Sequence, residues 1–175
     1  MKERKFKTKT LTVCAMLSAI SVVILYLGSL IDVLDASMAV IASLACVIAV
    51  IEFGKAAPWM IYSVTSVLSV LLLANKSPAV MYAGFFGFYP ILKEIFEKRN
   101  KVIAWVLKEI TFNVALVVCF LIIRFVIFFD IPPIPIAMYV IGAVLIEVIF
   151  VLYDIALTRL ISVYIFKIRK RLKLK

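Results

Sequence analysis

Six long apolar runs, separated by short charged or proline-rich links, make up most of this chain of 175 residues. Hydrophobic residues account for 66% of the chain and charged residues for 17%, whereas a soluble globular domain has about 45–50% and about 25%. A soluble protein of 19.7 kDa cannot bury this surplus, because much of the surface of such a small chain stays exposed. Each run instead approaches the length of about 20 residues that a helix needs to cross a bilayer. The sequence therefore excludes an ordinary soluble domain.

The boundaries of these runs predict an all-α integral membrane protein, a compact bundle of six transmembrane helices in a single domain over residues 1–175. Backbone polar groups in lipid must be paired within their own segment, so each run is expected to be a helix. The first run is longer than the apolar region of a signal peptide, so we expect it to be retained. The spans are predicted at about residues 11–31, 36–53, 57–74, 78–92, 102–129 and 136–161, with a basic tail at 162–175.

The distribution of positive charge predicts the orientation. Eighteen of the twenty Lys and Arg residues lie on one side, at the two ends of the chain, in the second and fourth links, or in the adjoining ends of the fifth and sixth spans. Only Lys76 lies in a link on the opposite side, and Arg124 lies inside a span. Because Lys and Arg accumulate in cytoplasmic loops, we expect both termini in the cytoplasm of a bacterial cell and the spans in its plasma membrane. The net charge of +10 then indicates contact with anionic lipids rather than with nucleic acid.

The residue types present argue against catalysis and against bound metal or cofactor. The chain contains no histidine, which removes the common catalytic triads and most zinc sites. Its three cysteines, Cys14, Cys46 and Cys119, are isolated within apolar runs and show no metal or redox spacing. There is no P-loop, so these residues cannot draw energy from ATP themselves. We therefore expect a protein that is not an enzyme and that has no cofactor and no metal site.

Polar residues inside a span are costly and are therefore candidates for function. Arg124 lies in the outer third of the fifth span, and Asn113 lies three turns away on the same face. Tyr82, Phe85 and Tyr139 enter their spans from the outer side to a similar depth. These five residues are predicted to line an outward-facing substrate pocket, in which Arg124 would hold a carboxylate or phosphate. The alternative is that Arg124 reaches the outer headgroups or pairs with an aspartate of the outer links.

Two further features allow both a structural and a functional interpretation. Ala15 and Ala19 form a small-xxx-small pair in the first span, which suits either packing within the chain or docking to a partner membrane protein. Glu147 lies near the middle of the sixth span, and Asp154 lies two turns further along the same face. These two acids are candidates for an ion or proton path, or else they pair with basic residues nearby.

The overall layout resembles the S component, the substrate-binding membrane subunit, of energy-coupling factor (ECF) transporters. The resemblance rests on chain length, six spans with both ends inside, a basic N-terminus, and the start of the first span, where Ala15-x-x-x-Ala19 matches the family's A-x-x-x-A docking motif. It implies that the chain binds a vitamin or another micronutrient from outside. It also implies that Ala15 and Ala19 face a membrane coupling subunit, which two ATPase subunits drive.

The sequence thus predicts a subunit for uptake of a small, vitamin-like and potentially anionic molecule. The alternative is a scaffold without transport activity, similar in size and span number to the MreD family of cell-shape proteins. In a scaffold, the polar residues within the spans would serve only packing and partner contact.

Overall fold

A computed structural model of the protein describes the backbone of residues 8–54, 56–126 and 136–168 and the side chains of residues 8–31, 33–54, 56–122 and 141–167. Throughout these ranges the regular secondary structure is helical, and no strand occurs in them. The chain divides into two compact units, Met1–Phe128 and Phe129–Lys175. The all-α prediction is confirmed for the described residues, and the two units are described separately below.

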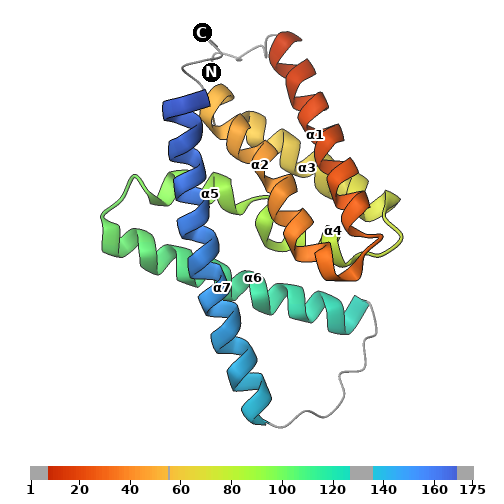
Figure 1. Cartoon of the computed structure of the whole chain (residues 1–175), viewed down its shortest axis with the longest axis vertical. Helices are drawn as coiled ribbons and strands as arrows, with labels where there is room; N and C mark the ends of the chain where they lie inside the picture. The colour runs from red at the N-terminus through yellow and green to blue at the C-terminus, as the bar shows by residue number, and fades with distance from the viewer. Residues whose placement is uncertain (1–7, 55, 127–135, 169–175) are drawn as a thin grey trace. The chain divides into compact units, whose positions relative to one another are not determined.

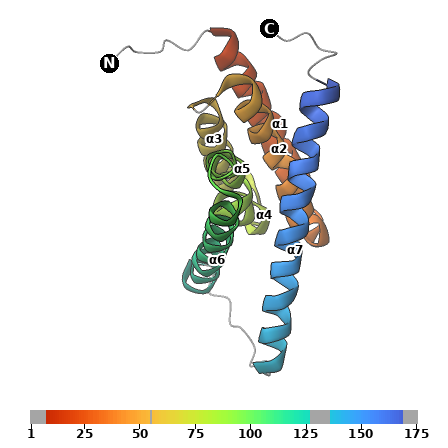
Figure 2. The same ribbon diagram turned by 90° about the vertical axis from the view of Figure 1, so that its left-hand side faces the viewer.

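The first three helices of unit 1 pack against one another (Figure 1). They are α1 (Thr8–Gly28), α2 (Asp35–Phe53) and α3 (Ala56–Leu72). Figure 2 shows α1 and α2 running side by side. Small side chains of α2, including Ala39, Ala42 and Ala49, are fully buried, which lets neighbouring backbones come close. The Ser21 hydroxyl of α1 donates to the carbonyl oxygens of Leu17, at 2.9 Å, and of Ala42 in α2, at 3.2 Å.

The turns between these helices depend on glycine. A Cβ atom at Gly28 would lie 2.7 Å from the Cβ of Met38, so only glycine permits the close corner between α1 and α2. A single 3-10 turn, η1 (Asp32–Leu34), completes this corner. Gly54 ends α2 with a φ of +79°, a conformation that L side chains rarely adopt. The end of α2 at Phe53 agrees with the predicted boundary.

The predicted span at residues 78–92 is not one continuous α-helix. It consists of α4 (Ser77–Met81), a π-helical segment η2 (Tyr82–Phe86), a turn at residues 87–88, and α5 (Tyr89–Phe96). Pro78 and Pro90 lie in the first turns of α4 and α5, where a missing backbone donor is tolerated. The prediction of a single helix is therefore corrected, because the second proline and the π-helix divide the segment.

The last helix of unit 1, α6 (Lys101–Val126), packs against η2 and α5. Unit 2 contains α7 (Ile136–Val163), which continues directly into a π-helical turn, η3 (Tyr164–Ile168). The described part of α7 is apolar along its length, apart from isolated polar positions such as Glu147 and Asp154.

Four helical segments are long and apolar enough to cross a membrane: Thr8–Gly28, Asp35–Phe53, Lys101–Ile122 and Ile141–Lys167. The apolar helix α3 is shorter, at 17 residues. Large apolar side chains are exposed on these helices, as at Met16, Val23 and Val102. A soluble protein avoids apolar surface of this extent, so the helices support a membrane protein.

Candidate functional site

Unit 1 contains a half-open cavity of about 790 Å³ between the α3–α4–η2 segment and α6. Small-molecule sites in proteins commonly have volumes of about 300–1,000 Å³. One wall consists of Val70, Lys76, Val80, Ala83, Gly84 and Phe88. The α6 wall consists of Ile110, Thr111, Val114, Ala115, Val118 and Ile122. Among the described residues of this lining only Lys76 and Thr111 are polar, so the cavity suits a molecule with a large apolar part.

The π-helix η2 forms the middle of one wall. Its widened turn is closed by the backbone N–H of Gly87, which donates to the carbonyl oxygen of Tyr82 at 2.8 Å. The Tyr62 hydroxyl of α3 donates to the carbonyl oxygen of Ala83, also at 2.8 Å, and so ties α3 to this wall. Single π-helical turns within α-helices are rare and occur frequently at functional sites. The irregular backbone here adjoins the cavity.

We expect Tyr62→Phe to destabilise the protein by about 0.5–1.5 kcal/mol, the net contribution of one hydrogen bond. The substitution keeps the ring and removes only the hydroxyl that bonds to the carbonyl oxygen of Ala83. Tyr26→Phe is the matched control, because the Tyr26 side chain is 47% exposed on α1. Thermal unfolding of both variants in the same detergent would test this, and equal melting temperatures would contradict the role of Tyr62.

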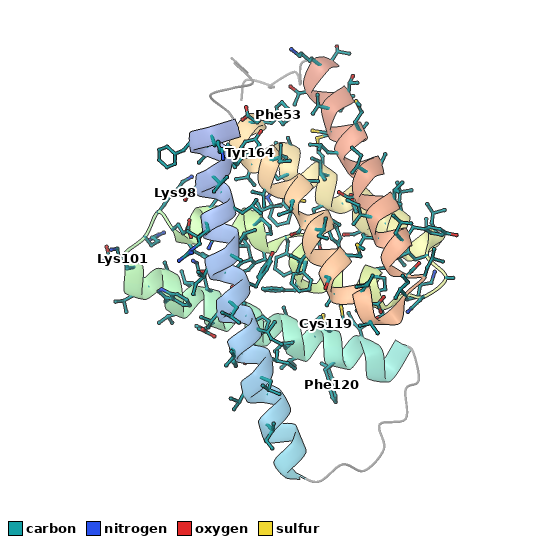
Figure 3. The ribbon with its side chains drawn as sticks, in the orientation of Figure 1. Phe53, Lys98, Lys101, Cys119, Phe120 and Tyr164 are labelled. Atoms are coloured by element: carbon teal, nitrogen blue, oxygen red, sulfur yellow. The ribbon has the colours of Figure 1, made fainter. Side chains whose placement is uncertain are left out.

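Gly84 allows α6 to approach η2 closely. A Cβ atom at this position would collide with the sulfur of Cys119 on α6. In Figure 3, Cys119 points from α6 toward the packed helices of unit 1, whereas the neighbouring Phe120 points away from them. The Phe120 side chain is correspondingly exposed. The contact between Gly84 and Cys119 fixes the separation of the two cavity walls.

The predicted site residues Tyr82 and Phe85 lie in the packed interior behind the cavity wall. Tyr82 is fully buried, and its hydroxyl lies 3.4 Å from the sulfur of Cys46. The ring of Phe85 packs against those of Tyr89, with centroids 4.7 Å apart, and Phe112, at 5.1 Å. Neither Tyr82 nor Phe85 is part of the cavity lining. Both support the wall from behind, because they anchor η2 against α2 and α6.

Lys76 is the one charged residue among the described residues that line the cavity. Its ammonium group donates to the carbonyl oxygens of Val70, at 2.7 Å, and Leu73, at 2.5 Å, and so caps the end of α3. The neighbouring Asn75 accepts a hydrogen bond from the Ser77 backbone at 2.9 Å, which orders the link to α4. The position of the ammonium group is therefore set by two backbone contacts.

The remaining predicted pocket residues are Asn113, Arg124 and Tyr139. Asn113 is exposed on α6, and its amide donates to the carbonyl oxygen of Glu109 at 3.0 Å. It adjoins the lining residue Val114 in sequence but does not line the cavity itself. The side chains of Arg124 and Tyr139 lie outside the described residues. Arg124 belongs to α6 and Tyr139 to α7.

The predicted docking pair, Ala15 and Ala19, is exposed on α1. The buried positions of α1 lie beside them on the helix and include Cys14 and Ser18. Glu147 and Asp154 both lie on α7 in unit 2, seven positions apart in sequence. Within the ranges that the structure describes, no group of three or more metal-ligating side chains occurs.

Ion pairs connect α5 to α6. The carboxylate of Glu97 lies 2.9 Å from the ammonium of Lys93 and 3.1 Å from that of Lys108. Glu94 and Lys98 form a third pair, at 2.6 Å. Figure 3 labels Lys98 and Lys101 at the two sides of the short link between α5 and α6. Because both Lys93 and Lys108 are buried, these contacts help to fix where α6 begins and thus the α6 wall of the cavity.

No family model matches this chain, and no curated protein or solved structure shows significant similarity to it. Its function must therefore be inferred from the cavity and from the sequence pattern.

Sequence reasoning missed most of the cavity lining, because valine, isoleucine and alanine in an apolar run carry no chemical signal. Lys76 is the exception. It is the only basic residue in the links that are predicted to lie on the side opposite to most other basic residues. That isolation was visible in the sequence and could have indicated it as a candidate.

Proposed function

We propose that this protein is the substrate-binding membrane subunit of an ECF-type uptake transporter. The observation that carries the proposal is the cavity of about 790 Å³ between η2 and α6. Its volume and apolar lining suit a small molecule, and the adjoining π-helix is the kind of irregular backbone that lines functional sites in membrane proteins. The substrate is a vitamin-like or other micronutrient that enters from the outer side.

The proposal includes six crossings with both termini in the cytoplasm. The four long apolar helices supply four of them. At about 1.5 Å per residue, the 17 residues of α3 extend about 26 Å, which is close to the hydrocarbon thickness of about 30 Å. The combined α4–η2–α5 segment provides the sixth crossing. In this orientation the link that contains Lys76 faces the outside.

Energy for uptake has to come from partner subunits, because the sequence contains no P-loop. The exposed pair Ala15 and Ala19 is the proposed contact for a membrane coupling subunit that associates with two ATPases. Small side chains at this spacing allow a second helix to approach closely in lipid. The resemblance to the S components points to the same two positions.

Purification from a native-like host tests this proposal. We expect an ATPase module and a bound small molecule to be recovered with the protein, both identified by mass spectrometry. Recovery of a cell-wall synthesis complex together with an empty cavity would contradict transport and favour the scaffold interpretation.

We further expect replacement of both Ala15 and Ala19 by leucine to lower recovery of the coupling subunit at least about tenfold, because bulky side chains keep the helices apart. The control replaces Ala143 and Ala156, two exposed alanines of α7, by leucine. Pull-down in nanodiscs measures the effect. Equal recovery from both double variants would show that α1 is not the docking helix.

A further inference from the structure

We infer that the ligand of the η2–α6 cavity is an elongated amphipathic molecule with an apolar body and a single acidic group, and that the acid binds at Lys76. This inference rests on the proposed function, because it takes the cavity as the substrate site. It goes further by specifying the chemistry of the substrate and the residue that recognises its charge.

The charge of the cavity lining is the first reason. Lys76 contributes one positive charge, and no other described residue of the lining is charged. Among the described residues, no carboxylate forms an ion pair with it. A lysine ammonium carries three donors, and two are taken by the carbonyl oxygens of Val70 and Leu73. The third N–H is therefore available to a ligand acceptor, and a carboxylate both accepts this bond and neutralises the charge.

The remaining lining restricts the rest of the ligand. Thr111 is the only other polar residue among the described lining residues, and its hydroxyl donates to the carbonyl oxygen of Leu107 at 2.7 Å. All the other lining positions are apolar or glycine. A sugar, a nucleotide or a molecule with several charges would lose hydration without gaining partners here, at a cost in free energy. An apolar ligand body has no polar hydration to lose when it enters the cavity.

The extent of the cavity along α6 indicates an elongated shape. Its lining on this helix extends from Ile110 to Ile122, which is about 18 Å at the rise of an α-helix. Lining positions recur every three or four residues, as at Ile110, Val114 and Val118, so one face of the helix forms a continuous apolar strip. A flexible or narrow apolar chain can follow such a strip, with its acid at Lys76.

Photolabelling of the full-length protein in phosphatidylcholine nanodiscs tests this inference. The probe is dodecanoic acid that carries a diazirine, and its comparison probe is the corresponding neutral alcohol. We expect the acid to label peptides of the two cavity walls, residues 80–88 and 110–122. Unlabelled dodecanoate should compete more strongly than dodecanol, by about three- to tenfold, the range expected for one partly exposed charge-assisted hydrogen bond.

Variants of Lys76 separate charge recognition from unspecific uptake of apolar molecules. Lys76→Gln should remove the preference for the acid, and Lys76→Arg should retain it. Lys98→Gln, which removes a charge paired with Glu94 outside the cavity, should leave the preference unchanged. An unchanged melting temperature shows that each variant is folded. Equal labelling by acid and alcohol in the wild type, or a preference that persists in Lys76→Gln, would overturn the inference.

Further labelling experiments show whether another molecule fills the cavity instead. If a diazirine-bearing phosphatidylcholine labels the same peptides and dodecanoate does not displace it, the cavity holds bilayer lipid and the inference is wrong. It is also wrong if crosslinks join these peptides to a second copy of the chain. If coupling subunits are recovered but the diazirine-bearing dodecanoic acid fails to label the cavity peptides, the ligand class is refuted while the transporter proposal stands. Acid-selective labelling without coupling subunits supports the ligand class and contradicts the transporter.

Discussion

Gly87→Ala is expected to destabilise the protein by about 1–3 kcal/mol, the usual cost of forcing extra volume into a packed interior. A Cβ atom at this position would lie 2.7 Å from a ring carbon of Tyr62 and 2.8 Å from one of Tyr82. Neither ring can easily move away. Tyr82 is fully buried, and the hydroxyl of Tyr62 is bonded to the carbonyl oxygen of Ala83. The clash must therefore displace the turn that follows the π-helix.

Thermal unfolding in detergent measures this effect, with a fall of about 2–4 °C expected for each kcal/mol in a chain of this length. Gly142→Ala on α7 is the matched control. A Cβ atom there meets nothing within 4 Å among the described residues, and alanine favours a helix more than glycine does. We expect the control to melt at or slightly above the wild-type temperature. A Gly87→Ala variant as stable as this control would refute the close packing of Tyr62 and Tyr82 around the turn.

The ends of several helices could be predicted from the sequence, because charge and glycine interrupt the apolar runs there. The second span was predicted at residues 36–53 and is observed as Asp35–Phe53, and Gly54 with its positive φ explains the sharp end. The third was predicted at 57–74 and is observed as Ala56–Leu72. Lys76 caps the carbonyl groups just before the α3–α4 link, which closes the helix. Charge, glycine and capping act over a few residues of the chain, so the local sequence is enough to predict these helix ends.

The interruption of the fourth run could not be predicted in the same way. Pro90 was visible, but the π-helix at Tyr82–Phe86 depends on contacts with distant residues. The Tyr62 hydroxyl reaches the carbonyl oxygen of Ala83 from another helix, and the sulfur of Cys119 occupies the space beside Gly84. Apolar periodicity carries no information about such tertiary contacts.

The candidate site, too, could be predicted from the sequence only in part. Polarity in an apolar run singled out Arg124 and Asn113, but Asn113 lies exposed on α6 and does not line the cavity. Aromatic character singled out Tyr82 and Phe85, which pack behind the wall. The cavity itself results from how α6 crosses η2, and its surface consists mainly of residues that look like ordinary lipid-facing positions. Only the position of Lys76 linked a visible sequence feature to the site.

Filling the cavity from the α6 wall should abolish ligand binding while leaving the fold intact. Val114 lines the cavity and is 57% exposed, so Val114→Trp adds bulk without opening the packed interior. Val117 lies on the same helix at 59% exposure but outside the lining, which makes Val117→Trp a closely matched control. The tryptophan at position 114 occupies the space that an apolar ligand body would need.

We expect Val114→Trp to reduce both photolabelling of residues 80–88 and recovery of co-purified ligand by at least about tenfold, equivalent to about 1.4 kcal/mol of binding free energy. Val117→Trp should match the wild type in both measurements, and the two variants should have similar melting temperatures. Because co-purified ligand is recovered whatever its chemistry, this measurement tests the location of the site independently of the acidic-amphiphile assignment. Undiminished ligand recovery from Val114→Trp would place the substrate elsewhere, whereas loss in both variants would trace the effect to bulk on α6 in general and not to the cavity.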